Sequence, residues 1–226
     1  MLDLEEQKAL SARAAARLVE DGQIIGLGTG TTMAYLIDAL AERTRAGLRF
    51  VGVPTSESTE RAARAVGFEL SSLEKHPTLD LDIDGADEVD PQLDLIKGRG
   101  GALLREKIVA CAARRFVVVV DESKPVQRLG ERSTVPVEVV PFGWTATQRA
   151  IEALGAEAVL RGAGEPFRTD NGNFILDCRF ANLSDPARLA RTVKGLPGVV
   201  EHGFFLGLAS LVLVGHADGT VTTMER

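Results

Sequence analysis

The apolar run Phe116–Val120 constrains the fold of this chain more than any other segment. Four of its five residues are valine, which is typical of a β-strand, and no polar residue interrupts it. A strand without a polar face must be covered on both sides, as in parallel sheets flanked by helices. The run therefore predicts a central strand in an open sheet.

The residues before this run alternate between strand-like and helix-like patterns. Strands are expected at 23–27, 48–53, 79–83 and 93–96, and helices at 3–20, 31–45, 56–66 and 102–114. Asp3 and Glu6 have the spacing of a capping box at the start of the first helix. Leu79–Ile83 alternates apolar and acidic residues, which predicts a strand with one wetter face or at a sheet edge. The alternation favours an α/β fold with an open, mostly parallel, Rossmann-like sheet and helices on both faces.

The pattern changes near Gly130. Strands are expected at 135–140, 156–161, 174–179 and 198–204, with helices at 145–154 and from Ser184-Asp185-Pro186 to 194. The order βαββαβ predicts a smaller ferredoxin-like α+β domain. A final strand pair at 209–214 and 219–224 can return to the first sheet. We therefore expect one domain from 1–130 with 206–226 and a second from 131–205.

Composition excludes several classes of function. The net charge is −6 over 226 residues, which argues against a nucleic-acid partner held by a basic surface. No apolar run approaches the roughly 20 residues that span a membrane. The acidic N-terminus does not resemble a secretory signal. Cys111 and Cys178 lie far apart, without the spacing of a structural zinc site, so a cytoplasmic location is expected.

Two carboxylates follow the strand expected at 79–83. Asp84 and Asp87 lie at its C-terminal end, where ligands bind in open α/β sheets. Such carboxylates can accept sugar hydroxyls or relay protons. Helix capping and metal binding are the alternatives, and the metal reading lacks support because His76, His202 and His216 are scattered.

Charged residues continue into the glycine-rich turn that follows. Lys97 opens the sequence K-G-R-G-G, where its ammonium can neutralise an oxyanion while the glycines admit a ligand. Glu106 lies one turn into the next expected helix, and Lys124 follows the central strand. For each of the three, a solvated surface position is the alternative interpretation.

The segment Gly26–Thr32 joins the first strand to a helix. Its backbone N–H groups and the hydroxyls of Thr29, Thr31 and Thr32 can hold a phosphate. A tight structural turn is the alternative. A dinucleotide site fits poorly, because Thr31 occupies the third glycine position and the second strand does not end in an acid.

Together these motifs resemble ribose-5-phosphate isomerases of the A type. The resemblance rests on G-L-G-T-G-T-T, D-I-D-G-A-D-E, I-K-G-R-G-G-A-L-L-R-E-K and D-E-S-K, and it runs in order through nearly the whole chain. The second and third of these motifs are the most specific. Arg99 departs from the pattern, since the family often has glycine there.

The resemblance implies reversible isomerisation of ribose 5-phosphate to ribulose 5-phosphate through an enediolate, in the non-oxidative pentose phosphate pathway. It implies no cofactor and no metal. Glu106 would be the base, Asp84 would assist ring opening with Asp87 positioning it, and Lys97 would stabilise the enediolate. The substrate-binding residues would be Thr29, Gly30, Thr31, Thr32, Asp84, Gly85, Ala86, Asp87, Lys97, Gly98, Arg99, Gly100 and Lys124. Repulsion among the negative charges of Asp84, Asp87 and Glu106 should raise the pKa of at least one of them, and the positive charge of Lys97 should oppose that rise.

Other functions remain open. A fold of this kind can also serve an amino-sugar phosphate deaminase or a CoA transferase, or a regulatory domain that senses sugar phosphates without turnover. The acidic charge and the lack of an evident DNA-binding module weigh against the regulatory domain. The expected ferredoxin-like unit, 131–205, is a common association module, so we expect a homodimer or homotetramer.

Overall fold

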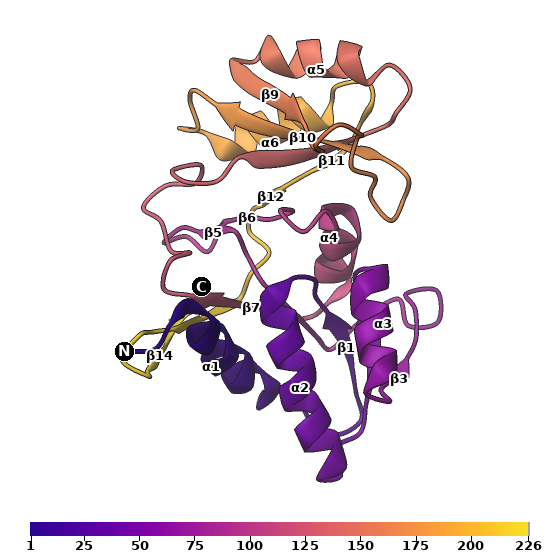
Figure 1. The fold of residues 1–226 in the computed structure, drawn as a ribbon, viewed down its shortest axis with the longest axis vertical. Coiled ribbons are helices and arrows are strands. Elements are labelled where there is room, and N and C mark those ends of the chain that lie inside the picture. The colour runs from indigo at the N-terminus through magenta and orange to yellow at the C-terminus, as the bar shows by residue number, and fades with distance from the viewer. Residues whose placement is uncertain (226) are drawn as a thin grey trace.

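A seven-stranded sheet forms the larger part of the protein (Figure 1). The computed structural model describes residues 1–225, so Arg226, the last residue of the expected first domain, lies outside the description. The strand order is β14-β13-β7-β4-β1-β2-β3, and every neighbouring pair is parallel except β13 and β14. The strands are β1 (Gln23–Leu27), β2 (Phe50–Pro54), β3 (Glu69–Leu70), β4 (Leu81–Asp84), β7 (Phe116–Asp121), β13 (Leu211–Gly215) and β14 (Val221–Glu225).

Strand β7 has a hydrophobic core on each of its faces, as its sequence predicts. Val117 and Val119 pack into a core shared with α1 (Leu4–Ala16) and α2 (Thr31–Arg45), which also includes Ala63 of α3 (Glu57–Ala65). Val118 and Val120 point the other way, into a core that includes Ala110 of α4 (Leu103–Ala112). The predicted open sheet with helices on both faces is confirmed.

Helix α1 has the predicted start but a different end. Asp3 and Glu6 form the reciprocal capping box. The helix ends at Ala16 rather than near residue 20. The Arg43 guanidinium from α2 donates to the carbonyl oxygens of Ala16 and Val19, so these carbonyls are satisfied outside a continuing helix.

The prediction for β4 was wrong in one respect. This strand is neither wet nor at an edge: it lies between β1 and β7, and all four of its residues are buried. Asp82, one of the acidic residues that suggested a wetter face, has no exposed surface. The alternating pattern misled because Asp82 and Asp84 lie in the protein interior, close to Lys97 and Glu106. A single sequence does not show whether acidic side chains on one strand face meet water or buried charged groups.

The second half of the chain forms a separate four-stranded antiparallel sheet. Its order is β11-β8-β10-β9, with the chain order βαββαβ that defines the ferredoxin-like arrangement. The elements are β8 (Val135–Val139), α5 (Trp144–Glu152), β9 (Ala156–Leu160), β10 (Phe174–Phe180), α6 (Pro186–Lys194) and β11 (Val199–His202). Helix α6 starts where predicted, with Asp185 accepting the Arg188 N–H and Pro186 in the first turn.

A small third sheet joins the two larger ones. It contains Leu95–Ile96 of the strand expected at 93–96, but the sheet itself was not predicted. It consists of β5 (Glu88–Val89), β6 (Leu95–Ile96) and β12 (Phe204–Phe205). The chain passes through β12 as it returns from the second sheet to β13 (Figure 1). Ile96 and Phe204 also belong to the core of the ferredoxin-like half. Within residues 1–225, no helix is both long and apolar enough to cross a membrane.

Candidate active site

The candidate site lies where the strand order of the large sheet reverses. Strands β1, β2 and β3 follow one another to one side, whereas β4, β7 and β13 extend to the other. Between the carboxyl ends of β1 and β4 the two directions diverge, and open α/β sheets bind ligands in the crevice at such a point. Asp84 ends β4, and Gly28–Thr32 follows β1 into α2.

The glycines after β1 make room for carboxylates on β4. Gly26 pairs in register with Asp82. Gly28, just after β1, donates its N–H to the Ile83 carbonyl at 2.9 Å and so lies beside Asp84. A Cβ atom on Gly28 would clash with the Asp84 carboxyl and lie 2.6 Å from the Asp84 Cα. A Cβ atom on Gly26 would clash with the Asp82 carboxyl. The G-L-G sequence is therefore needed for close strand packing around two buried acids.

Asp84 also organises the loop after β1. Its Oδ1 accepts the N–H groups of Thr29, at 3.0 Å, and Gly85, at 2.7 Å. The Thr29 hydroxyl lies among three other hydroxyls, those of Thr55, Ser56 and Thr59. Thr29 is thus engaged within the protein on both its N–H and its hydroxyl.

Lys97 brings the two principal carboxylates together. Its Nζ lies 3.0 Å from Asp84 Oδ2 and 3.3 Å from Glu106 Oε2, and it donates to the Gly85 carbonyl at 2.6 Å. The three side chains are at most 3% exposed. Apart from the Lys97 ammonium, Asp84 Oδ2 and Glu106 Oε2 have no partner among residues 1–225. Each of these oxygens can therefore accept a proton, or a hydrogen bond from a hydroxyl group of a ligand.

Burial changes the acidity of this cluster. It raises the pKa of Glu106 to about 8; Lys97 opposes the rise, whereas Asp84 and Asp87 add to it. Burial likewise raises the pKa of Asp84 against the same Lys97 charge. Burial alone would lower the Lys97 pKa, but the carboxylates of Asp84 and Glu106 hold it above its usual value. Lys97 stays an ammonium while a carboxylate beside it titrates near neutrality, as expected of a general base.

A cavity of about 380 Å³ opens above this cluster. Asp87 and Lys124 reach it from the loops after β4 and β7, and Asp87 Oδ2 accepts the Arg99 N–H at 3.0 Å. Asp84 lies beneath the cavity rather than in its wall. The lining comprises every other predicted site residue and one more: Lys8, Thr29, Gly30, Thr31, Thr32, Gly85, Ala86, Asp87, Lys97, Gly98, Arg99, Gly100, Glu106 and Lys124.

Sequence reasoning missed two residues here. Lys8 reaches the cavity from α1 because that helix packs against β7 and β13, and no local motif marks it. Asp82 is fully buried, and neither of its carboxyl oxygens has a hydrogen-bond partner among residues 1–225. Burial, followed by the nearby Asp84 charge, raises its pKa well above the ordinary range. Asp82 lies two residues before Asp84, and residues two apart on a strand share one face. This spacing was the available sequence signal that Asp82 lies near the site.

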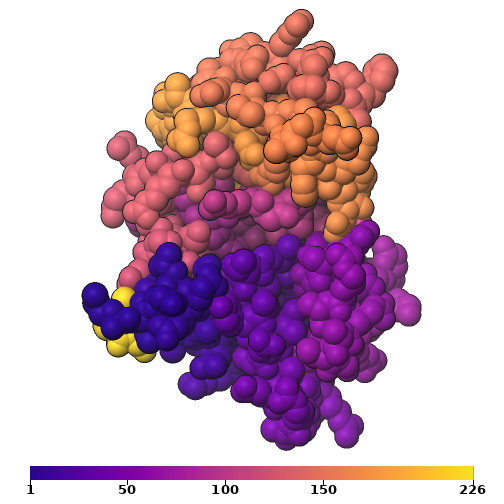
Figure 2. Space-filling view, viewed as in Figure 1, coloured from indigo at the N-terminus to yellow at the C-terminus, as the bar shows by residue number. Residues whose placement is uncertain are grey.

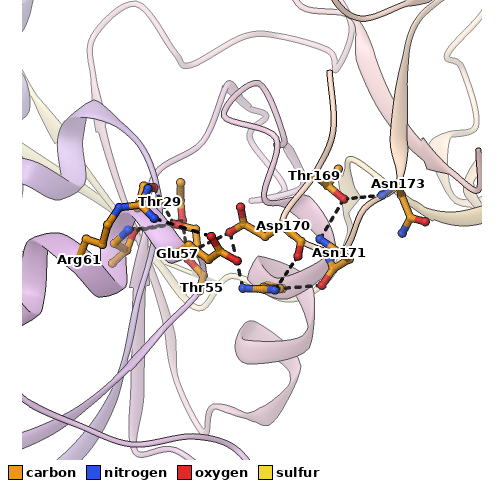
Figure 3. Close-up of polar contacts among 12 residues, drawn as sticks. Thr29, Thr55, Glu57, Arg61, Thr169, Asp170, Asn171 and Asn173 are labelled. Atoms are coloured by element: carbon orange, nitrogen blue, oxygen red, sulfur yellow. Dashed lines mark hydrogen bonds and ion pairs between the residues drawn. The ribbon is translucent and has the colours of Figure 1, made fainter. Parts of the chain in front are cut away.

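The ferredoxin-like half contributes a loop, residues 161–173, that contacts the turn after Lys97 and helices α3 and α4. Arg161 Nη1 donates to the carbonyl oxygens of Gly98 and Arg99, at 2.9 and 3.0 Å. Asp170 Oδ2 accepts the Glu57 N–H at 2.7 Å and lies 3.6 Å from Arg105 Nη1. Figure 3 shows Asp170 beside Glu57. In Figure 2 the orange lobe meets the purple lobe at the right of the view, near this loop. The ferredoxin-like half therefore holds the turn after Lys97 in place, although none of its residues lines the cavity.

The described part of the chain, residues 1–225, contains no cluster of three or more His, Cys, Asp and Glu side chains suited to a metal ion. The only cation in the cluster described above is the Lys97 ammonium. Any charge stabilisation that this cluster gives a reacting oxygen therefore comes from Lys97.

Comparison with known proteins identifies the family. Residues 51–219 match the model of ribose 5-phosphate isomerase A, also called phosphoriboisomerase A. Ribose-5-phosphate isomerase A of Gloeobacter violaceus is 54% identical over 220 residues, which cover 96% of each chain. The chain belongs to the ribose 5-phosphate isomerase A family.

Solved members of the ribose 5-phosphate isomerase A family share the fold over the whole chain. A D-ribose-5-phosphate isomerase in complex with phospho-erythronic acid has a TM-score of 0.95 at 42% identity, with all of both chains covered. The enzyme of Methanocaldococcus jannaschii has a TM-score of 0.93 at 43% identity, covering 98% of this chain and 99% of its own. The resemblance seen in the sequence motifs is confirmed.

Proposed function

We propose that this chain interconverts ribose 5-phosphate and ribulose 5-phosphate. The observation that carries the proposal is Lys97, buried between Asp84 and Glu106 at the floor of the cavity. Aldose–ketose isomerisation needs a base and a fixed positive charge beside it, and this cluster supplies both. Family membership supports the same reaction, and a solved relative holds phospho-erythronic acid.

Glu106 acts as the base in this proposal. Its carboxylate removes the proton from C2 of the open-chain aldose, and the electron pair of that bond forms the C1–C2 double bond of an enediolate. The carbonyl electrons move to O1, beside the Lys97 ammonium, which stabilises the developing charge. Glu106 then returns the proton to C1, while the O2 proton passes to O1 and leaves a ketone at C2.

Asp84 and Asp87 prepare the substrate. Asp84 Oδ1 is occupied by two backbone N–H groups, so its Oδ2 is the atom available to a sugar hydroxyl during ring opening. Asp87 holds the Arg99 backbone through its own carboxylate and keeps the turn 98–101 close to the sugar. Neither role requires a metal ion or an organic cofactor.

The phosphate end is assigned to the opposite part of the lining. The hydroxyls of Thr31 and Thr32 have no partner among residues 1–225, and they stand at the N-terminus of α2, which favours an anion. Lys8 and Lys124 add two ammonium groups to the same cavity. Thr29 and Gly30 shape this loop, and Gly85, Ala86, Gly98, Arg99 and Gly100 border the sugar.

The test is an assay with ribose 5-phosphate in deuterium oxide with excess EDTA. We expect ribulose 5-phosphate to form with solvent deuterium at C1, because the proton that Glu106 removes from C2 exchanges with the solvent before Glu106 delivers it to C1. Activity lost to EDTA and restored by zinc or magnesium would overturn the metal-free mechanism. Ammonia release from glucosamine 6-phosphate, or a covalent glutamyl-CoA adduct, with no isomerisation, would favour the alternative enzymes.

We further propose that the division of the chain into residues 1–130 with 206–226 and residues 131–205 is functional, and that the second unit mediates a homodimer or homotetramer. A ferredoxin-like sheet offers a surface for self-association. Light scattering at micromolar concentration tests this, and a monomeric mass contradicts it. Both cysteines are free thiols, which suits the proposed cytoplasmic location.

A further inference from the structure

A second cavity, of about 350 Å³, adjoins the candidate active site. Asp87 and Arg99 line both cavities. The rest of its wall comes from the segment that leads into β8, from β8 and β10, and from Arg161 just after β9. The complete lining is Asp87, Arg99, Arg132, Ser133, Thr134, Pro136, Arg161, Asp177 and Arg179. We call it the arginine cavity.

One arginine of this cavity is already neutralised. Arg161 donates through Nε and Nη2 to both oxygens of Asp177, at 2.8 and 2.5 Å, and through Nη1 to backbone carbonyls. The pair is a bidentate ion pair, and four of the five N–H donors of Arg161 are engaged within the protein. It forms a fixed wall of the cavity and contributes no net charge.

The other three arginines have unused donors. The guanidinium groups of Arg99 and Arg179 make no hydrogen bond or ion pair with any residue of the described range 1–225. Arg132 uses only Nη1, on the Ser123 carbonyl. Against these three positive charges the cavity holds one further carboxylate, Asp87, which already accepts the Arg99 N–H. The cavity therefore concentrates positive charge on a protein whose net charge is −6.

We propose that the arginine cavity is a second anion site, which binds the phosphoryl group of a small molecule. Guanidinium groups present paired donors that match phosphate oxygens, and several arginines around one cavity suit a doubly charged anion. Ser133 and Thr134 add hydroxyl donors at its wall. The site is distinct from the proposed substrate-phosphate position at Thr31 and Thr32.

Binding at the arginine cavity should act on the catalytic turn. Arg99 lies two residues after Lys97, and its carbonyl and that of Gly98 are held by Arg161. An anion bound by the Arg99 side chain would restrain this turn in addition to the hydrogen bonds from Arg161. A bound phosphoryl group therefore stabilises the folded protein and restrains the segment that carries Lys97.

The experiment uses thermal unfolding in HEPES buffer, with inorganic phosphate as the probe and ionic strength held constant with chloride. A Thr31→Ala/Thr32→Ala protein removes the two hydroxyl donors of the proposed substrate-phosphate position, so the part of the remaining phosphate effect that Arg179→Gln abolishes reports the arginine cavity. We expect phosphate still to raise its Tm. Adding Arg179→Gln should weaken that phosphate affinity about 10- to 100-fold. Arg188→Gln, an exposed arginine of α6, is the matched control and should change nothing.

The same variants separate this proposal from the proposed function. Arg179→Gln alone should isomerise ribose 5-phosphate as the wild type does in phosphate-free buffer. A phosphate effect that is absent in the threonine variant, or equal with and without Arg179→Gln and Arg132→Gln, excludes free phosphate as the occupant, and it overturns the second site if the bisphosphate titration described next is also unchanged. Loss of isomerase activity alone leaves this binding result standing.

A pentose 1,5-bisphosphate in a parallel titration identifies the source of the phosphoryl group. If Arg179→Gln weakens the bisphosphate but not free phosphate, the cavity receives the second phosphoryl group of the molecule in the active site. If both weaken equally, the cavity takes free phosphate. If neither weakens, the proposal fails.

Discussion

Gly28, the residue after β1, packs against Asp84 at the end of the neighbouring parallel strand β4, so closely that any side chain on Gly28 would strike the Asp84 main chain. This contact links two motifs that are 56 positions apart in the sequence. Position 28 must be glycine because Asp84 occupies the space of a side chain there. The Asp84 carboxylate in turn accepts the Thr29 N–H. Four predictions follow from this site and its surroundings.

Gly28→Ala should destabilise the protein and reduce turnover. The added methyl group must displace Asp84, and overpacking a tight site typically costs about 1–3 kcal/mol. Thermal unfolding and the isomerase assay measure the two effects. Gly195→Ala is the control, because a Cβ atom there makes only ordinary contacts, at 3.5 Å, and the backbone φ is −77°. Equal behaviour of the two variants would contradict the steric argument.

Glu106→Gln should lower kcat by about 10²–10⁴-fold, because the amide keeps the shape of the side chain but cannot accept the C2 proton. KM should change little, since the phosphate-binding groups remain. Deuterium exchange into substrate should fall in parallel. Glu60→Gln, at a helix surface position paired with Arg64, is the control. Near-normal turnover in Glu106→Gln, together with complete loss in Asp84→Asn, would move the base to Asp84.

The value of kcat/KM should rise with pH toward a plateau. Burial raises the pKa of Glu106 to about 8, so its basic form is a minority of the free protein at pH 7. We expect kcat/KM to rise nearly tenfold per pH unit well below pH 8 and to level off above it. Initial rates between pH 6 and 9.5 measure this. A profile already flat from pH 6 would show that the base is ionised in the free protein at neutrality.

Asp82→Asn should stabilise the protein at neutral pH. The folded-state pKa of Asp82 is raised by burial, so its favourable contribution is present below the unfolded pKa, near 4, and is lost as pH rises toward the folded value. The other ionisable groups that act on Asp82 are Asp84 on the same strand, Lys97 and Glu106.

The gain from Asp82→Asn should grow by about 1.4 kcal/mol per pH unit from pH 4 upward, until the folded carboxyl ionises. Denaturant unfolding at several pH values measures it. Asp80→Asn, two residues earlier at a partly exposed ion pair with Arg114, is the matched control. A gain independent of pH would mean that Asp82 is ionised in the folded protein.

Much of the fold could be predicted from local patterns. Strand β1 and helix α2 have the bounds expected from the sequence, the capping box of Asp3 and Glu6 is present, and β7 lies inside the sheet. These features depend on periodicity and on side chains within one turn or strand, where short-range physics dominates. A strand was expected at 93–96, which includes β6, but the small sheet that β6 forms with β5 and β12 was not, because each of its strands has only two residues and β12 pairs with β6 across about 110 positions.

The sequence by itself determined which residue types meet at the carboxyl ends of the strands. Asp84, Lys97 and Glu106 belong to motifs that are readable in order, and the parallel topology brings strand ends to one edge. Only the tertiary structure decided how those groups interact: that Lys97 lies within 3.3 Å of both carboxylates, that Asp82 is buried rather than wet, and that Lys8 reaches the cavity. The reason is physical, since burial and Coulomb interactions depend on the distances between segments, which no local pattern contains.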